Sequence, residues 1–148
     1  MYRFERQALT ELTPGAFVER RTVRFQEVDA AGIVFFATFF TYFHDAYAGF
    51  LEATDRPLSR ALTHSEWAAP LRHAEADYFR PLRYADIIDI AVVRVHVEAS
   101  EVTVGYRVAR GNEVVAVGQT VHVFVDPATF SRSAVPQELL AAFARLSS

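Results

Sequence analysis

The residue best placed to do chemistry is Asp29, which opens the short turn-like segment Asp29-Ala30-Ala31-Gly32. A carboxylate can attack an electrophilic carbonyl carbon directly, or it can deprotonate a water molecule that attacks instead. A helix starting just after Asp29 would point unpaired N–H groups at this junction, where they would polarise a bound carbonyl oxygen. Gly32 would let the backbone approach that group without a Cβ in the way. This combination suits hydrolysis of a thioester, because a thiolate leaves with little acid assistance.

Apolar side chains follow the turn and would surround the carboxylate. Val34, Phe35 and Phe36 suit a flat group or an acyl group. His44 lies eight residues after Phe36, at the edge of the expected apolar helix face, and could contact a bound acyl group or a subunit interface. Asp45 falls on the opposite, solvated face and is the reserve candidate for a catalytic carboxylate.

These residue types also allow other interpretations. Asp29 could simply cap a helix or form an Asx turn, with Gly32 serving the turn, and the common spacing Asp-x-x-Gly alone favours this structural alternative. The chain has no cysteine, which excludes disulfides and a cysteine nucleophile. Its histidines have no metal-ligand spacing, so we expect no metal. Ser131 and Ser133 lack the context of a serine hydrolase.

Length and composition indicate one domain spanning residues 1–148, with 51% hydrophobic residues to build a core. The net charge is −3, so no basic field attracts nucleic acid, and we expect no nucleic-acid partner. Residues 1–16 lack the apolar run of a signal peptide, and no window approaches the ~18 apolar residues of a membrane span. We therefore expect no membrane association and a cytoplasmic location.

The element that follows Asp29 is a long aromatic stretch from 33 to 51. Large apolar residues recur in it at helical spacing, which predicts one amphipathic helix ending near 55–57. Residues 20–28 precede it with an imperfect alternation that predicts a strand. The apolar helix face is so rich in rings that a broad surface must cover it, and the rest of the chain offers mainly strands.

The second half of the chain is rich in valine and isoleucine and predicts consecutive antiparallel strands. Hairpins are expected at Ala99-Ser100 and at Gly111-Asn112, a final helix at 137–146, and an edge strand at 3–9. The fold class is α+β, an antiparallel sheet wrapped around one long central helix, and its open edge predicts a homodimer or homotetramer. The expected strands are 75–83, 87–98, 102–110 and 114–125.

Two segments carry a resemblance to a known family. Residues 23–46, VRFQEVDAAGIVFFATFFTYFHDA, resemble the signature of 4-hydroxybenzoyl-CoA thioesterase-like hotdog enzymes, and 78–86 resemble the family's second strand and turn. About two-thirds of the chain is covered. The resemblance implies a hotdog fold, a homodimer or homotetramer, no cofactor, and Asp29 as the essential residue. It also implies that the Phe36 backbone amide meets the thioester carbonyl.

The segment His44-Asp45-Ala46-Tyr47 is most similar to the branch that hydrolyses 1,4-dihydroxy-2-naphthoyl-CoA in menaquinone or phylloquinone biosynthesis, where His-Glu-Ala-Tyr is usual. The resemblance thus implies this ester, or 4-hydroxybenzoyl-CoA, as substrate. One departure is the acidic hairpin tip at 98–101, where some relatives carry basic residues that contact the CoA phosphates. The remaining candidates for those contacts are Arg72, Arg80, Arg83 and Arg94.

Alternatives to this function stay open. Without a basic hairpin tip, the acyl carrier could be the pantetheine arm of a protein, and the acyl group could be a short chain. A hydratase or dehydratase on the same fold is disfavoured, because no histidine closely follows Asp29. A non-catalytic acyl-CoA-binding protein would keep the fold and bind the ester without releasing free thiol.

Overall fold

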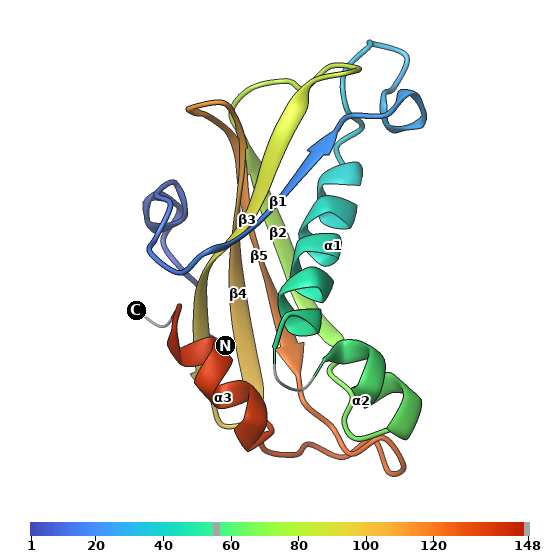
Figure 1. The fold of residues 1–148 in the computed structure, drawn as a ribbon, viewed down its shortest axis with the longest axis vertical. Helices are drawn as coiled ribbons and strands as arrows, with labels where there is room; N and C mark the ends of the chain where they lie inside the picture. The colour runs from blue at the N-terminus through green and yellow to red at the C-terminus, as the bar shows by residue number, and fades with distance from the viewer. Residues whose placement is uncertain (55–56, 147–148) are drawn as a thin grey trace.

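Five strands form one antiparallel sheet that curls around helix α1 (Thr38–Glu52), as Figure 1 shows. The structure is a computed structural model that describes residues 1–54 and 57–146. The strand order β1-β3-β4-β5-β2 leaves β1 and β2 at the two edges of the sheet. This arrangement confirms the predicted α+β hotdog fold. The strands are β1 (Phe17–Thr22), β2 (Leu71–Tyr78), β3 (Ile87–Glu98), β4 (Glu101–Arg110) and β5 (Glu113–Val123).

Helix α1 buries one face against the concave side of the sheet. Phe43 is fully buried and stacks on Tyr106 of β4, with ring centroids 4.9 Å apart. The predicted start at residue 33 is wrong, because residues 33–37 are held in a loop in which the Val34 N–H donates to Leu82 O at 2.8 Å. The buried face of the helix also differs from the predicted apolar face, since Phe36 is exposed. The buried residues of α1 are Phe39, Tyr42, Phe43, Ala46, Tyr47, Phe50 and Leu51.

The strand predicted at 20–28 is misplaced, because β1 spans Phe17–Thr22. Residues Phe25–Glu27 form a short 3-10 helix instead. The Glu27 carboxylate accepts a hydrogen bond from the Arg24 N–H at 2.8 Å and one from the Tyr42 hydroxyl at 3.0 Å. These bonds turn the chain away from the sheet, so the imperfect alternation at 24–28 reflects a side-chain network and not a strand.

Strand β2 begins and ends earlier than predicted at 75–83, because the N–H groups of Phe79 and Arg80 both turn to Val115 O and Pro81 follows. A further short helix, α2 (Leu58–His64), lies between α1 and β2 and follows Pro57. A proline just before an apolar stretch was a usable helix-start signal. Strand β3 has the predicted bounds, and both two-residue hairpins are confirmed by the pairs Glu98 with Glu101 and Arg110 with Glu113.

The chain termini lie close to the sheet and cover parts of it. Residues 3–9 are not an edge strand: Arg6–Leu9 form a 3-10 helix. The backbone of Phe4 exchanges two hydrogen bonds with the Gln119 side chain, at 2.8 and 3.0 Å, and this segment packs on the sheet face opposite α1 (Figure 1). The last helix, α3 (Gln137–Ala144), ends two residues before the predicted position.

Gly118 of β5 is the point where α1 packs closest to the sheet. A Cβ at this position would collide with the Phe43 ring and lie 2.8 Å from Glu75 O. We expect Gly118→Ala to lower the free energy of unfolding by about 1–3 kcal/mol, since overpacking displaces a buried ring or a strand. Urea unfolding measures this change. Gly111→Asn is the control, because its position is open and asparagine tolerates positive φ. A loss below about 0.5 kcal/mol for Gly118→Ala would contradict the close packing.

Candidate active site

Asp29 sits in a tight turn that uses only one of its carboxylate oxygens. Oδ1 accepts hydrogen bonds from the N–H groups of Ala31 at 2.8 Å and Ile33 at 3.4 Å. The Asp29 N–H donates to Ile33 O at 2.8 Å, and Gly32 takes φ +79° at the tightest point. Between the residues that the structure describes, no hydrogen bond involves Asp29 Oδ2. The Asx turn is therefore real, but it leaves one oxygen free for chemistry.

A buried network holds the Asp29 turn against the rest of the molecule. Glu27, two residues earlier, accepts hydrogen bonds from Arg21 at 3.1 Å and from Tyr42 of α1 at 3.0 Å. Arg21 also pairs with Asp45 of α1 at 2.8 Å. The Phe35 N–H donates to Glu27 O at 2.9 Å, so both ends of the turn are tied to one residue. Asp45, the reserve candidate, thus serves as an ion-pair partner on the outer side of the helix.

Asp29 lines a mainly apolar cleft of about 480 Å³, called here the Asp29 cleft. The structure brings Asp29, Val34 and Phe36 together in it, whereas Gly32 and Phe35 lie outside the lining. Tyr78, at the end of β2, donates a hydrogen bond from its hydroxyl to Phe36 O at 2.9 Å. The lining residues are Asp29, Ile33, Val34, Phe36, Phe39, Tyr78, Phe79, Arg80, Pro81 and Leu82.

The unused backbone donor beside Asp29 is the Phe36 amide that the family resemblance implied, and not an N–H group in the first turn of the helix. Helix α1 begins at Thr38, and the N–H groups of Thr38, Phe39 and Phe40 are already bonded to carbonyl oxygens three residues earlier. The Phe36 N–H lies before the helix, and within the described residues it donates to no acceptor. A carbonyl oxygen in the cleft could therefore be polarised by this loop amide, rather than by the first turn of the helix.

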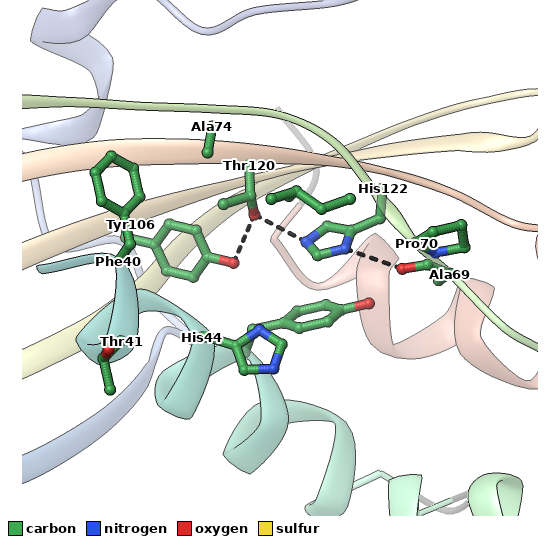
Figure 2. A pocket seen from close by; sticks show the side chains of 11 residues that line it. Phe40, Thr41, His44, Ala69, Pro70, Ala74, Tyr106, Thr120 and His122 are labelled. Carbon is green, nitrogen blue, oxygen red and sulfur yellow. Dashed lines mark hydrogen bonds between the residues drawn. The ribbon is translucent and has the colours of Figure 1, made fainter. Parts of the chain in front are cut away.

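His44 lines a second cavity of about 540 Å³, called here the His44 pocket, which lies between α1 and the start of β2. Figure 2 shows His44 and Thr41 on the helix side of the pocket and a row of polar side chains on the sheet side. Tyr106, Thr120 and His122 form that row and are all buried. The lining residues are Phe40, Thr41, His44, Tyr47, Ala69, Pro70, Leu71, Ala74, Tyr106, Thr120 and His122.

Sequence reasoning missed this polar row and also Tyr78. A signal for the row existed, because Thr120 and His122 are two residues apart in a strand and must share a face. Their partner Tyr106 comes from the neighbouring strand and could not be assigned without the register. The structure therefore places His44 with residues that were not predicted, and in a different pocket from Asp29.

Three of the four arginines considered for phosphate contacts already have partners. Arg72 pairs with Glu101, and Arg94 donates to Ala8 O at 2.8 Å. Arg80 lines the Asp29 cleft and lies 3.6 Å from Glu113, and the Arg83 side chain has no ion-pair partner among the described residues. Within residues 1–54 and 57–146, no group of three or more His, Asp or Glu could hold a metal ion.

Burial lowers the pKa of His122 to about 4, so folding favours its neutral form. The folded pKa lies below the unfolded value of about 6.5, so the unfolded chain binds more protons between these values. The contribution of His122 to the free energy of unfolding is fully present above pH 6.5. It is lost as pH falls toward 4, by about 3 kcal/mol in total. We expect His122→Gln to flatten the pH dependence of unfolding in this range, measured by urea titrations. Exposed His64→Gln is the control, and equal slopes for both variants would refute the assignment.

An antiparallel sheet wrapped around one long helix is the hotdog architecture, and a carboxylate oxygen in an apolar cleft before that helix is compatible with thioester hydrolysis. Comparison with known proteins gives the family. The chain belongs to the thioesterase-like superfamily, whose model matches residues 23–143. None of the described helices is long and apolar enough to cross a membrane.

Several relatives carry the name 1,4-dihydroxy-2-naphthoyl-CoA hydrolase. The protein of that name from Nostoc punctiforme is 37% identical over 127 residues, which cover 84% of each chain. The one from Rippkaea orientalis is 35% identical and covers 81% of this chain and 89% of its own. The crystal structure of a 1,4-dihydroxy-2-naphthoyl-CoA thioesterase from Synechocystis matches with a TM-score of 0.80 at 25% identity, over 87% of this chain and 96% of that one.

Proposed function

We propose that this protein hydrolyses an aromatic acyl-CoA thioester, with 1,4-dihydroxy-2-naphthoyl-CoA as the first candidate and 4-hydroxybenzoyl-CoA as the second. The observation that carries the proposal is the Asp29 carboxylate, which keeps Oδ2 free in an apolar cleft beside the unused Phe36 N–H. The names of relatives at 31–37% identity support the choice of ester.

The chemistry needs two groups in the Asp29 cleft. The Phe36 N–H would bind the thioester carbonyl oxygen and stabilise the negative charge that develops on it. Asp29 Oδ2 would either attack the carbonyl carbon, forming a mixed anhydride and releasing the CoA thiolate, or deprotonate a water that attacks. In the first route, water then cleaves the anhydride and regenerates the carboxylate. Either route ends with the free acid and CoA.

The active site would be completed by a second copy of the chain. Strand β2 is an edge strand, with the Asp29 cleft at its Tyr78 end and the His44 pocket at its Leu71 end. In a two-fold dimer that pairs β2 with its own copy in antiparallel order, the Tyr78 end of one subunit meets the Leu71 end of the other. Asp29 of one subunit would then face the His44 pocket of the second, and His44 could contact the acyl group.

The surface around this edge supports such a dimer. Phe35, Phe36, Leu71 and Tyr78 are all large apolar residues, and their exposed fractions range from 45% to 62%. Large exposed apolar side chains at both ends of an unpaired edge strand favour covering by another chain. Further pairing of dimers into a homotetramer and a cytoplasmic location stay predictions, as does a role in menaquinone or phylloquinone biosynthesis.

Substrate preference tests the proposal. Purified protein would be given a panel of aromatic acyl-CoA, short-chain acyl-CoA and acyl-carrier-protein esters, and thiol release would be followed colorimetrically. We expect the highest kcat/KM for a hydroxylated aromatic CoA ester, by about tenfold or more over short aliphatic esters. A preference for the carrier-protein esters would instead favour the pantetheine alternative suggested by the acidic hairpin tip at 98–101.

A further inference from the structure

A chain of three hydrogen bonds runs along the His44 pocket. The Tyr106 and Thr120 hydroxyl oxygens are 2.8 Å apart, and Thr120 Oγ1 lies 2.9 Å from His122 Nε2. His122 Nδ1 lies 3.2 Å from Ala69 O at the other end. Figure 2 shows the three side chains in a row, linked by these bonds. None of them is used by the hydrolysis chemistry of the Asp29 cleft.

The donor in each of these three hydrogen bonds can be assigned by starting from the bond to Ala69 O. A carbonyl oxygen only accepts, so His122 Nδ1 must carry the proton. Burial keeps the pKa of His122 far below neutral, so its Nε2 has a bare lone pair and must accept. The Thr120 hydroxyl therefore donates to Nε2, and the Tyr106 hydroxyl in turn donates to Thr120. All donors of the chain are used, and the Tyr106 oxygen keeps its capacity to accept.

Tyr47 supplies the complementary group in the same pocket. Its ring is buried and stacks on His122, with centroids 4.4 Å apart. Its hydroxyl is buried and has no hydrogen-bond partner among the described residues, so a donor is left over. Besides the exposed Thr41 and His44 side chains of α1, the pocket therefore offers two buried groups, an unused acceptor on Tyr106 and an unused donor on Tyr47. A buried hydroxyl without a partner is costly, so a ligand that engages it gains affinity.

A phenolic hydroxyl suits the unused acceptor on Tyr106, because it can donate a hydrogen bond to it. A carbonyl, carboxylate or ether oxygen cannot donate to Tyr106. The remaining surroundings are apolar or aromatic, with Phe40 and the Tyr47 ring among the walls, and the cavity of about 540 Å³ is within the usual range for small-molecule sites. These features suit a flat ring that carries a hydroxyl at its inner end.

We propose that Tyr106 is a specificity-determining residue, whose hydroxyl oxygen accepts a hydrogen bond from a phenolic hydroxyl on the acyl group. This inference rests on the proposed function and goes further, because it names the feature of the acyl group that is selected and the residue that selects it. Thr120 and His122 act as positioning residues, since they hold the Tyr106 proton away from the ligand.

Three CoA esters that differ at one ring position test this role: 1,4-dihydroxy-2-naphthoyl-CoA, the 1-hydroxy analogue with hydrogen at position 4, and the 1-hydroxy-4-methoxy analogue. We expect the wild type to prefer the 4-hydroxyl ester over both others by about tenfold or more in kcat/KM. The methoxy ester keeps an oxygen but cannot donate a hydrogen bond. A preference for the hydroxyl ester over the methoxy ester therefore shows that the ligand is the donor. Wild-type ratios within about twofold would overturn the proposal.

Variants separate the role of Tyr106 from a general effect on folding. Tyr106→Phe should reduce the ratio of 4-hydroxyl to 4-hydrogen ester to about threefold or less. Thr120→Val should free the Tyr106 O–H to donate to a ligand oxygen. The kcat/KM of the methoxy ester should then rise relative to that of the hydrogen ester. A merely structural role of Thr120 would not produce this change. Tyr84→Phe makes the same chemical change at an exposed tyrosine outside both pockets and should keep the wild-type ratios. Unchanged ratios in Tyr106→Phe would refute the assignment.

Dissociation constants keep this test independent of turnover. The same three esters would be titrated into Asp29→Asn protein, with Tyr106 either intact or replaced by phenylalanine. A preference for the 4-hydroxyl ester that disappears with Tyr106→Phe supports the selection of a hydroxyl even if no ester is hydrolysed. Turnover of all three esters at equal rates and equal affinities would leave the thioesterase function standing and remove the role of Tyr106.

Discussion

Asp29→Asn should lower kcat for thioester hydrolysis by about a hundredfold or more, because an amide is neither a nucleophile nor a general base at neutral pH. Asparagine keeps an oxygen that can accept the hydrogen bonds which Ala31 and Ile33 donate to Oδ1. The turn should therefore survive, and the loss should be chemical and not structural. Thiol release under saturating substrate measures kcat, and a thermal melt checks the fold.

Asp45→Asn is the matched control for this experiment. Asp45 is a carboxylate in the middle of α1, and its side chain, which is 44% exposed, pairs with Arg21 at 2.8 Å. Loss of a partly exposed ion pair should change stability by at most about 1 kcal/mol and leave kcat within about threefold. If Asp45→Asn abolishes turnover while Asp29→Asn does not, the carboxylate has been assigned to the wrong residue.

A mixed dimer of two inactive variants should recover about half of the wild-type activity per dimer. One of its two composite sites then carries both lesions, and the other carries neither. One subunit carries Asp29→Asn. The other carries Thr41→Trp, which would fill the His44 pocket from the exposed helix side. The intact site joins Asp29 of the second subunit to the open pocket of the first.

Heterodimers can be prepared by coexpressing the two variants with different affinity tags and purifying over both. Each homodimer should show at most a few per cent of wild-type thiol release on its own. If each active site lay within one subunit, both sites of the heterodimer would carry a lesion, and no activity would return. Recovery therefore tests the composite site separately from the identity of the catalytic carboxylate.

The fold could be predicted well because its signals are local. The valine-rich runs and two-residue turns located β3 and both hairpins, and the ring-rich period from Phe39 to Leu51 located the core of α1. Errors occurred where tertiary contacts override the local pattern. The alternation at 24–28 belongs to a short 3-10 helix whose bonds involve Glu27, and the Val34 N–H bonds to Leu82 O in the loop before α1 begins.

The candidate site was predictable only in part. Asp29 and Phe36 follow from one contiguous segment, so the sequence was sufficient to group them. The polar row of Tyr106, Thr120 and His122 depends on the register between β4 and β5, and an irregularity between Val108 and Ala109 shifts this register by one residue from the one that the two-residue turn sets. The separation of His44 from Asp29 within one subunit was also invisible, because it depends on how α1 lies along β2.

The most direct test of the central claim is thiol release from 1,4-dihydroxy-2-naphthoyl-CoA by the purified wild-type protein, with equilibrium binding of the same ester to Asp29→Asn measured in parallel. The account predicts multiple turnovers by the wild type, with tight binding and at least about a hundredfold slower release by the variant. Binding of this ester and of other acyl-CoA esters without release of thiol by the wild type would contradict it and identify an acyl-CoA-binding protein instead.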